Sequence, residues 1–287
     1  MSQEITPVKC TELIKKYGFS VRKKYGQNFL TDEGILESIV SEAEISKEDI
    51  VLEIGPGLGA LTVYLLNAAK KVIAVEVDKM LIPILKEALA GAKNLVLIND
   101  DILKTDLDTL ISEHAPGAKV KVVANLPYYI TTPVVIKLLE KASVIESITV
   151  MVQKEVAGRM CSKPGSKAYG ALSLAVSYYS KPEIVLDVSR NCFIPRPDVD
   201  SSVIKLDIYE PEARPVKTDD PEKMFALIRA AFDQRRKTLA NAVSNSSNLG
   251  YTREDVLSAL KEMGLSENIR GEALSLPEFA RLSELLP

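Results

Sequence analysis

The segment EIGPGLGALT, residues 53–62, joins an apolar run of strand length to a stretch with helical spacing. Gly55, Gly57 and Gly59 stand at the junction, where glycine permits a tight turn and close backbone approach. The helix that follows presents unpaired backbone N–H groups to the same place. The spacing G-x-G-x-G is one residue shorter than the dinucleotide fingerprint G-x-G-x-x-G. Taken alone, the loop can also be an ordinary strand-to-helix turn.

Short apolar runs alternate with helical stretches through the first two thirds of the chain. The runs of strand length are IVLEIG (50–55), KVIAVEV (71–77), NLVLIN (94–99) and KVVAN (121–125), followed by ESITVMV (146–152), PEIVLDV (182–188) and SSVIKLDIY (201–209). ALTVYLLNAA and KMLIPILKEALAG, between the first three runs, have apolar residues at helical spacing. This alternation predicts an α/β fold with a parallel sheet and helices on both faces.

The composition changes at YEPEARPVKTDDPE (209–222), which is polar, contains proline and lacks apolar periodicity. We interpret this stretch as a linker. Beyond it, MFALIRAAF, RKTLANAV, REDVLSALKEMG and LPEFARLSELL all have helical spacing. We therefore expect residues 1–209 to form one domain with a basic N-terminal arm, and residues 210–287 to form a small all-helical domain.

The overall composition, 46% hydrophobic and 26% charged, is typical of a soluble globular protein. Because no apolar run reaches membrane-spanning length and no signal-peptide block begins the chain, we expect a cytoplasmic protein without a membrane partner. Three separated cysteines predict reduced thiols. The single histidine, His114, lies in the polar stretch SEHAPGAK, so we expect a solvated loop residue and no metal site.

The net charge of −3 argues weakly against a nucleic-acid partner, but the basic residues are clustered. The first cluster comprises Lys9, Lys15, Lys16, Arg22, Lys23 and Lys24, and this stretch of the sequence contains one acid, Glu12. A second cluster, QRRK, carries Arg235, Arg236 and Lys237. Each cluster alone is typical of a solvated face, whereas together they are compatible with a partly basic, RNA-facing surface.

Two acids lie at the ends of the next two strands. Glu76 ends the second strand, where a carboxylate can accept both hydroxyls of a ribose. Asp101 follows the third strand, within reach of an adenine amine on a ligand that crosses the strand ends. Either acid alone could instead cap a helix. The glycine loop and two acids at three successive strand ends predict an adenosine-containing ligand.

The fourth strand runs into NLPYYITTP, residues 125–133. The exocyclic amine of adenine is a poor nucleophile because its lone pair is delocalised into the ring. Asn125 offers a side-chain oxygen and Leu126 a carbonyl as acceptors for the two N–H bonds of such an amine. Pro127 restricts the backbone of Leu126, and Tyr128 can stack on the base, worth about 1–3 kcal/mol. A plain proline turn is the alternative interpretation.

The helix predicted after this segment, TTPVVIKLLEK, would have Thr131 or Thr132 as its N-cap and Pro133 in its first turn.

The glycine loop with its two acids resembles the class I, Rossmann-like methyltransferases. Because the glycine spacing is short and no other nicotinamide feature is present, the resemblance favours S-adenosylmethionine over NAD. In that family the glycine loop holds the amino-acid part of the cofactor, the acid after the second strand holds the ribose, and the next acid faces the adenine.

Further motifs resemble the ribosomal RNA adenine dimethyltransferases, above all their bacterial small-subunit members. The similar stretches extend from about residue 9 to the end, and they are KKYGQNFLTD (23–32), NLPYYITTPVV (125–135), MVQKEVAGRM (151–160), FIPRPDVDSSVIKL (193–206), AFDQRRKTLANAV (231–243) and RGEALSLPEFARL (270–282). The resemblance implies methyl transfer from S-adenosylmethionine to N6 of two adjacent adenosines near the 3′ end of 16S rRNA. The implied partner is an immature small ribosomal subunit, and we expect a monomer.

The resemblance also implies roles for individual residues. Its cofactor-contacting positions correspond to Asn28, Leu30, Gly55, Gly57, Gly59, Glu76, Asp101 and Asn125. We expect Asn125, Leu126, Pro127 and Tyr128 to handle the base, with Phe193 as the opposite wall of the base slot or, alternatively, as a core residue. Phosphate contacts are expected from Arg22, Lys23, Lys24, Arg190, Arg196, Arg235, Arg236 and Lys237.

Three alternatives from other classes remain at this point. One is an antibiotic-resistance methyltransferase of the large-subunit RNA, although QRRKTLAN and ALSLPEFARL favour the small subunit. A second is a non-enzymatic RNA-binding assembly factor, although intact Glu76, Asp101, Asn125 and Tyr128 favour catalysis. The third is an NAD-dependent oxidoreductase, which would bind nicotinamide rather than the sulfonium cofactor.

Overall fold

The computed structural model describes residues 10–18, 22, 25–141 and 143–287. It divides into two compact units, which are considered separately below. The first comprises Met1–Ala157 and Pro182–Ile208, and the second comprises Gly158–Lys181 and Tyr209–Pro287.

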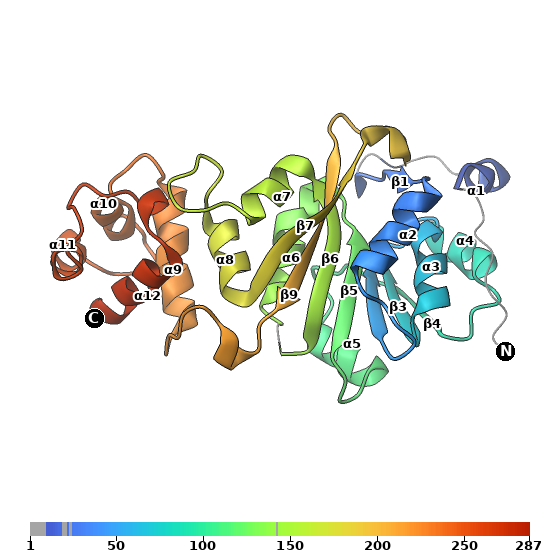
Figure 1. The fold of residues 1–287 in the computed structure, drawn as a ribbon, viewed down its shortest axis with the longest axis horizontal. Coiled ribbons are helices and arrows are strands. Elements are labelled where there is room, and N and C mark those ends of the chain that lie inside the picture. Colours follow the sequence, from blue (N-terminus) through green and yellow to red (C-terminus); the bar gives the residue numbers. More distant parts are fainter. Residues whose placement is uncertain (1–9, 19–21, 23–24, 142) are drawn as a thin grey trace. The chain divides into compact units, whose positions relative to one another are not determined.

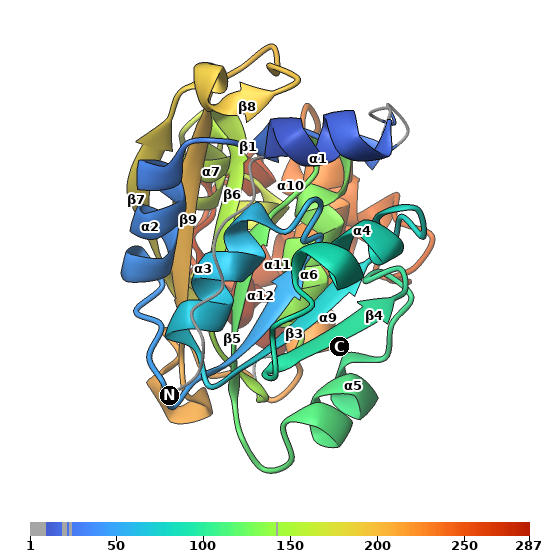
Figure 2. The ribbon, with the colours of Figure 1, turned by 90° about the vertical axis from the view of Figure 1, so that its right-hand side faces the viewer.

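The first unit is built around a seven-stranded sheet with the order β4-β3-β2-β5-β6-β9-β7 (Figure 1). The first five strands in this order are parallel, and β9 runs antiparallel to β6. The bounds are β2 (Ile50–Ile54), β3 (Lys71–Glu76), β4 (Leu95–Asn99), β5 (Val120–Asn125), β6 (Ile145–Gln153), β7 (Ser180–Val188) and β9 (Ser201–Ile208). A separate antiparallel pair joins β1 (Phe29–Leu30) to β8 (Phe193–Ile194), which lie side by side in Figure 2.

Helices cover the sheet because its central strands are apolar on both faces. The helices that begin in this unit are α1 (Cys10–Tyr17), α2 (Glu33–Glu42), α3 (Ala60–Ala68), α4 (Leu81–Ala88), α5 (Leu107–His114), α6 (Thr131–Leu139) and α7 (Lys154–Met160), with 3-10 turns η2 (Tyr128–Ile130) and η3 (Arg190–Cys192). Val51 and Val72 share a core cluster with α2, α3 and α4. Their neighbours Leu52 and Ile73, which point to the other face, are also fully buried.

The second unit is helical. It contains α8 (Ala171–Tyr179), α9 (Pro221–Asp233), α10 (Leu239–Ser244), α11 (Arg253–Glu262) and α12 (Leu276–Leu285), with 3-10 turns η4 (Pro211–Ala213) and η5 (Gly271–Ala273). Tyr169, Leu174 and Tyr178 belong to the same core cluster as the buried residues of α9 and α12. Residues 158–181 therefore group with the helical unit. The domain boundary expected from the sequence, after residue 209, would instead place them in the first domain.

Two local expectations are wrong. His114 is the last residue of α5 instead of a loop residue, and the helical hydrogen bonds continue past it, since the N–H of Ala115 donates to the carbonyl of Ile111. The N-cap of α6 is Ile130, not a threonine. Thr131 is the first helical residue, and its Oγ1 donates to the carbonyl of Pro127 at 3.3 Å.

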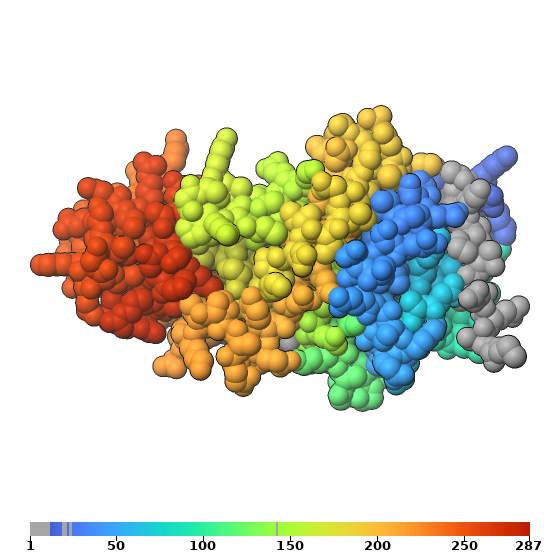
Figure 3. All heavy atoms as spheres, viewed as in Figure 1, coloured from blue at the N-terminus to red at the C-terminus, as the bar shows by residue number. Residues whose placement is uncertain are grey.

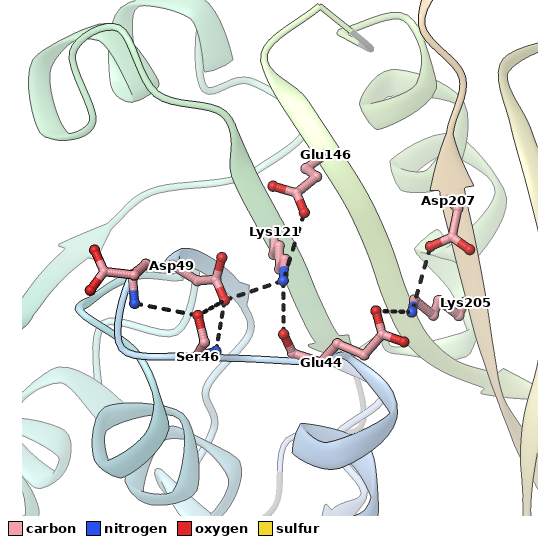
Figure 4. Close-up of polar contacts among 8 residues, drawn as sticks. Glu44, Ser46, Asp49, Lys121, Glu146, Lys205 and Asp207 are labelled. Carbon is pink, nitrogen blue, oxygen red and sulfur yellow. Dashed lines mark hydrogen bonds and ion pairs between the residues drawn. The ribbon is translucent and has the colours of Figure 1, made fainter. Parts of the chain in front are cut away.

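A charged network lies at the end of the sheet where β5 begins (Figure 4). Lys121 at the start of β5 donates to the carbonyl of Glu44 at 2.8 Å and to Asp49 Oδ2 at 3.2 Å. Lys205 on β9 pairs with Glu44 Oε2 at 2.9 Å and with Asp207 at 3.6 Å. These contacts tie the loop between α2 and β2 to two other strands.

None of the described helices combines the length and apolar character needed to span a bilayer. Within the same residues, no cluster of three or more histidine, cysteine or acidic side chains could hold a metal ion.

Candidate active site

The glycine loop makes an abrupt turn from β2 into α3. Gly57 has φ +61°, a conformation that side-chain-bearing residues rarely adopt. A Cβ at this position would come within 3.1 Å of the Phe29 ring. The loop and β1 are therefore in close contact, and only glycine fits between them without displacing that ring.

Glu76 at the end of β3 is bound to this loop. Its Oε2 accepts the backbone N–H of Gly57 at 3.1 Å, and its Oε1 accepts that of Asp78 at 2.8 Å. Burial of the side chain raises the pKa of Glu76, and the two backbone hydrogen bonds oppose the rise. Glu76 does not cap α4, whose N-cap is Met80. Each carboxylate oxygen retains a lone pair for a ligand hydroxyl.

Asp101 lies just beyond β4. Its Oδ1 accepts the backbone N–H of Leu103 at 3.0 Å, and its carbonyl accepts those of Lys104 and Thr105. The residue stabilises the turn after the strand, while Asp106 caps the next helix. The side chain of Asp101 is 35% exposed, so it remains accessible to a ligand.

The segment 125–128 continues β5 into the η2 turn. Asn125 Nδ2 donates to the backbone carbonyl of Asn28 at 3.0 Å. The N–H of Leu126 donates to the carbonyl of Met151 at 3.2 Å. Pro127 is extended, with φ −56° and ψ 133°, and Tyr128 is half-buried with its hydroxyl 2.9 Å from Ser201 Oγ. Asn125, Leu126 and Tyr128 therefore lie together at the carboxyl end of β5, where all three line one pocket.

One pocket of about 260 Å³ brings most of these groups together. Its lining is formed by residues 25–30, 53–58, 60–61, 75–77, 100–103 and 125–130, with Leu36 and Leu81. The expected residues along it are Asn28, Leu30, Gly55, Gly57, Glu76, Asp101, Asn125, Leu126, Pro127 and Tyr128. They come from the N-terminal segment and from the carboxyl ends of four parallel strands, the usual ligand position in such sheets.

Two expected residues lie elsewhere. Gly59 does not line the pocket: it begins α3, and a Cβ there would meet Leu85 of α4 at 3.2 Å. Phe193 is only 3% exposed, pairs with Leu30 across the β1–β8 ladder and belongs to the core cluster. Its position is that of the alternative interpretation, a core residue.

Glu53 is a pocket residue that the motif analysis did not select. It is the fourth of the five residues of β2, its side chain is buried, and its Oε2 has no hydrogen-bond partner within the described chain. Burial raises the pKa of Glu53 to about 8; the Thr62 hydroxyl opposes this shift and the charge of Glu76 adds to it. The signal in the sequence was an acid inside the apolar run IVLEIG.

Asp78 lies just outside the pocket lining and is another acid that the motif spacing did not single out. Its carboxylate is fully buried, accepts from Arg22 Nη1 at 3.3 Å and from Gln27 Nε2 at 3.1 Å, and thereby ties the segment before β1 to the loop after β3. The signal in the sequence was weaker for Asp78, because Glu76 is already the acid at the end of β3 and Asp78 follows it.

The expected phosphate-binding residues fall into two groups. Arg22, Arg190 and Arg235 are engaged within the chain, by Asp78, Asp200 and Glu272 respectively. The exposed group is Arg196, Arg236 and Lys237. Arg196 is carried by the surface segment 189–200 of the first unit (Figure 3). Lys23 and Lys24 lie outside the described residues.

A comparison with known families shows which family the chain belongs to. The model of the family described as "Ribosomal RNA adenine dimethylase" matches residues 18–286. The chain belongs to this family. The expected class of enzyme, a ribosomal RNA adenine dimethyltransferase, is thereby confirmed.

Individual relatives agree with this membership of the dimethylase family. Ribosomal RNA small subunit methyltransferase A of Lachnoclostridium phytofermentans is 52% identical over 281 residues, which cover 98% of this chain and 96% of that protein. A dimethyladenosine transferase from Plasmodium falciparum is 30% identical, with a TM-score of 0.73 over 88% of this chain and 95% of that one. The 23S rRNA methyltransferase ErmE is 27% identical, with a TM-score of 0.65 over 90% and 99% of the two chains. The predicted Rossmann-like methyltransferase fold is confirmed.

Proposed function

We propose that the protein transfers methyl groups from S-adenosylmethionine to N6 of two adjacent adenosines near the 3′ end of 16S rRNA, forming N6,N6-dimethyladenosine. The substrate would be an immature small ribosomal subunit in the cytoplasm, and the protein would act as a monomer. The observation that carries this proposal is the convergence of residues 125–128 on the pocket lined by Glu76 and Asp101. The small-subunit enzyme that is 52% identical supports the choice of RNA.

The pocket fits the proposed cofactor. Oε2 of buried Glu53 has no hydrogen-bond partner, so it would accept from the ammonium of an amino-acid group, whose positive charge would favour the ionised carboxylate. Glu76 would accept the ribose hydroxyls, and Asp101 would accept from the adenine amine. Asn28 and Leu30 would border the cofactor from the N-terminal side, with Gly55 and Gly57 beneath its amino-acid part. When bound, the cofactor supplies an electrophilic methyl group.

The residues 125–128 would orient the target amine. Because Asn125 Nδ2 already donates to Asn28, the side-chain oxygen is the atom that remains to accept from the substrate. The carbonyl of Leu126 would take the second N–H bond, so that the nitrogen lone pair turns toward the methyl group. Stacking on Tyr128 would fix the plane of the base. Positioning of this kind can supply roughly 7–11 kcal/mol.

No strong general base is required. The methylated amine is cationic at first and gives its proton to water. Burial raises the pKa of the Tyr128 phenol, so this group stays protonated at neutral pH and is a poor base. The single histidine of the chain, His114, lies outside the pocket.

The RNA would reach the pocket as an unpaired or flipped base, since a stacked adenine cannot enter it. The exposed cations Arg196, Arg236 and Lys237 would contact phosphates, together with Lys23 and Lys24. Arg22, Arg190 and Arg235 would do so only in competition with their internal carboxylate partners. An affinity that falls as salt increases is the expected signature.

Methyl transfer to purified immature particles tests the proposal. Labelled S-adenosylmethionine would be incubated with small and large particles, and the nucleosides would be analysed. The expected product is N6,N6-dimethyladenosine in small-subunit RNA alone. Label in large-subunit RNA would instead favour the activity that the name of ErmE describes. A Glu76→Ala variant that still binds the particle but has lost all methyl transfer would separate an assembly role from catalysis.

A further inference from the structure

Tyr128 is held at its hydroxyl end by Ser201. The two oxygens are 2.9 Å apart, and Ser201 is fully buried. Tyr128 is the first residue of η2 and follows the end of β5 by three positions, whereas Ser201 is the first residue of β9. In the sheet, β6 lies between these strands. The two strands are two strand spacings apart, roughly 10 Å, so the Tyr128 side chain crosses the carboxyl end of β6 to reach Ser201.

Ser201 is a rigid anchor. It is paired in register with Gln153, the last residue of β6. The residue before it, Asp200, accepts the N–H of Arg190 at 3.0 Å through its side chain and that of Lys154 at 3.1 Å through its carbonyl. The strand and its loop thus fix the serine, so a ring bonded to it is fixed as well.

The orientation of Tyr128 matters for the chemistry proposed above. An aromatic ring accepts a stacked base on its face, and the plane of the ring determines where the amine of that base lies. Small errors in such placement reduce turnover strongly. The next residue, Tyr129, is 58% exposed, which shows that this turn does not by itself bury a tyrosine ring.

We propose that Ser201 is a positioning residue for methyl transfer: its hydroxyl holds the Tyr128 ring in the plane on which the target base stacks. This inference rests on the function proposed above. It also assigns a role to one of the two serines in the stretch FIPRPDVDSSVIKL, where the sequence alone did not distinguish Ser201 from Ser202.

Ser202 is a matched control. It is equally buried, and its Oγ donates to Asp187 Oδ1 at 2.7 Å. Successive strand residues point to opposite faces of a sheet, so this hydrogen bond leads away from Tyr128. Ser202→Ala removes one buried hydrogen bond from the same strand without touching the tyrosine.

The test is a double-mutant cycle on kcat and KM for immature small subunits. Ser201→Ala and Tyr128→Phe should each lower kcat about 3- to 10-fold, the equivalent of one hydrogen bond. KM should change little, because most contacts to the particle remain. The double variant should lose no more than either single variant, and Ser202→Ala should keep the wild-type kcat.

Three outcomes overturn the inference: wild-type kcat in Ser201→Ala, losses that multiply in the double variant, or an equal loss in Ser202→Ala. If Ser201→Ala does not fold in a thermal denaturation control, Tyr128→Phe decides alone, because it breaks the same bond without altering the sheet. Wild-type kcat in that variant also overturns it. Failure of the proposed function itself would look different, since the wild-type protein would then not methylate small subunits.

Discussion

Asn125 Nδ2 lies 3.0 Å from the backbone oxygen of Asn28 and donates a hydrogen bond to it. The end of β5 is thereby joined to the segment just before β1, which forms another wall of the same pocket. This bond determines which end of the amide faces the N-terminal segment, and it leaves the oxygen for a substrate amine. The side chain is oriented before any ligand arrives.

Asn125→Ala should lower kcat by about 100-fold, similar to the loss of one preorganised hydrogen-bonding group in other active sites. RNA affinity should be largely retained, because the proposed phosphate contacts lie elsewhere. Single-turnover methyl transfer and particle binding would be measured in parallel. Asn125→Asp provides the comparison, since it keeps an acceptor but cannot donate to Asn28. Undiminished turnover in Asn125→Ala would refute the orienting role.

Glu76→Ala should weaken S-adenosylmethionine binding by about 10- to 100-fold, because hydrogen bonds to a charged group contribute about 1.5–3 kcal/mol. The change also leaves the N–H of Gly57 without its acceptor. Titration calorimetry would measure the affinity. Glu87→Ala is the control, since that exposed acid pairs with Lys16 on the surface. Equal affinities in the two variants would contradict the assignment.

Glu53 should make the protein less stable as the pH rises. The folded chain retains a proton on Glu53 up to about pH 8, whereas the unfolded chain releases it near 4.5. Between these values the free energy of unfolding should fall by about 1.4 kcal/mol per pH unit from this group. Glu53→Gln removes this contribution, so its stability relative to wild type should increase from pH 5.5 to 7.5. If urea denaturation gave the same difference in the free energy of unfolding between the two proteins throughout that pH range, the raised pKa of Glu53 would be ruled out.

The strands of the seven-stranded sheet were predictable almost to the residue, whereas the short strands β1 and β8 were not predicted. Parallel strands buried on both faces leave continuous apolar runs, such as the one that became β2. An acid within such a run is conspicuous, yet motif spacing directed attention to Glu76 and Asp101 instead. Only the structure shows that Glu53 lines the pocket.

Features that depend on distant contacts were not predictable. The grouping of α8 with the helical unit follows from packing against helices that begin more than forty residues later. Phe193 is buried because β8 pairs with β1, far away in the sequence. Neither pairing leaves a local periodicity that sequence patterns could reveal.

Gly57→Ala should destabilise the fold by about 1–2 kcal/mol, the usual cost of a left-handed backbone for a residue with a side chain. The added Cβ would also press on the Phe29 ring, which should lower cofactor affinity. Gly91→Ala is the control, since a Cβ there meets no atom within 4 Å. Thermal unfolding and calorimetry would be compared for both. A Gly57→Ala protein as stable as Gly91→Ala would show that the loop relaxes at no cost.

Lys121→Met should reduce stability without reducing activity. Its ammonium satisfies the carbonyl of Glu44 and the carboxylate of Asp49, and the side chain is only 12% exposed (Figure 4). Losing these buried hydrogen bonds should cost about 1–3 kcal/mol. Because the network lies at the end of the sheet opposite the pocket, kcat at moderate temperature should be unchanged.

The control is Lys141→Met, which removes a more exposed pair with Asp108 and should cost less than about 1 kcal/mol. Urea denaturation distinguishes the two, and an equal loss in both variants would show that the loop between α2 and β2 is held by its other contacts.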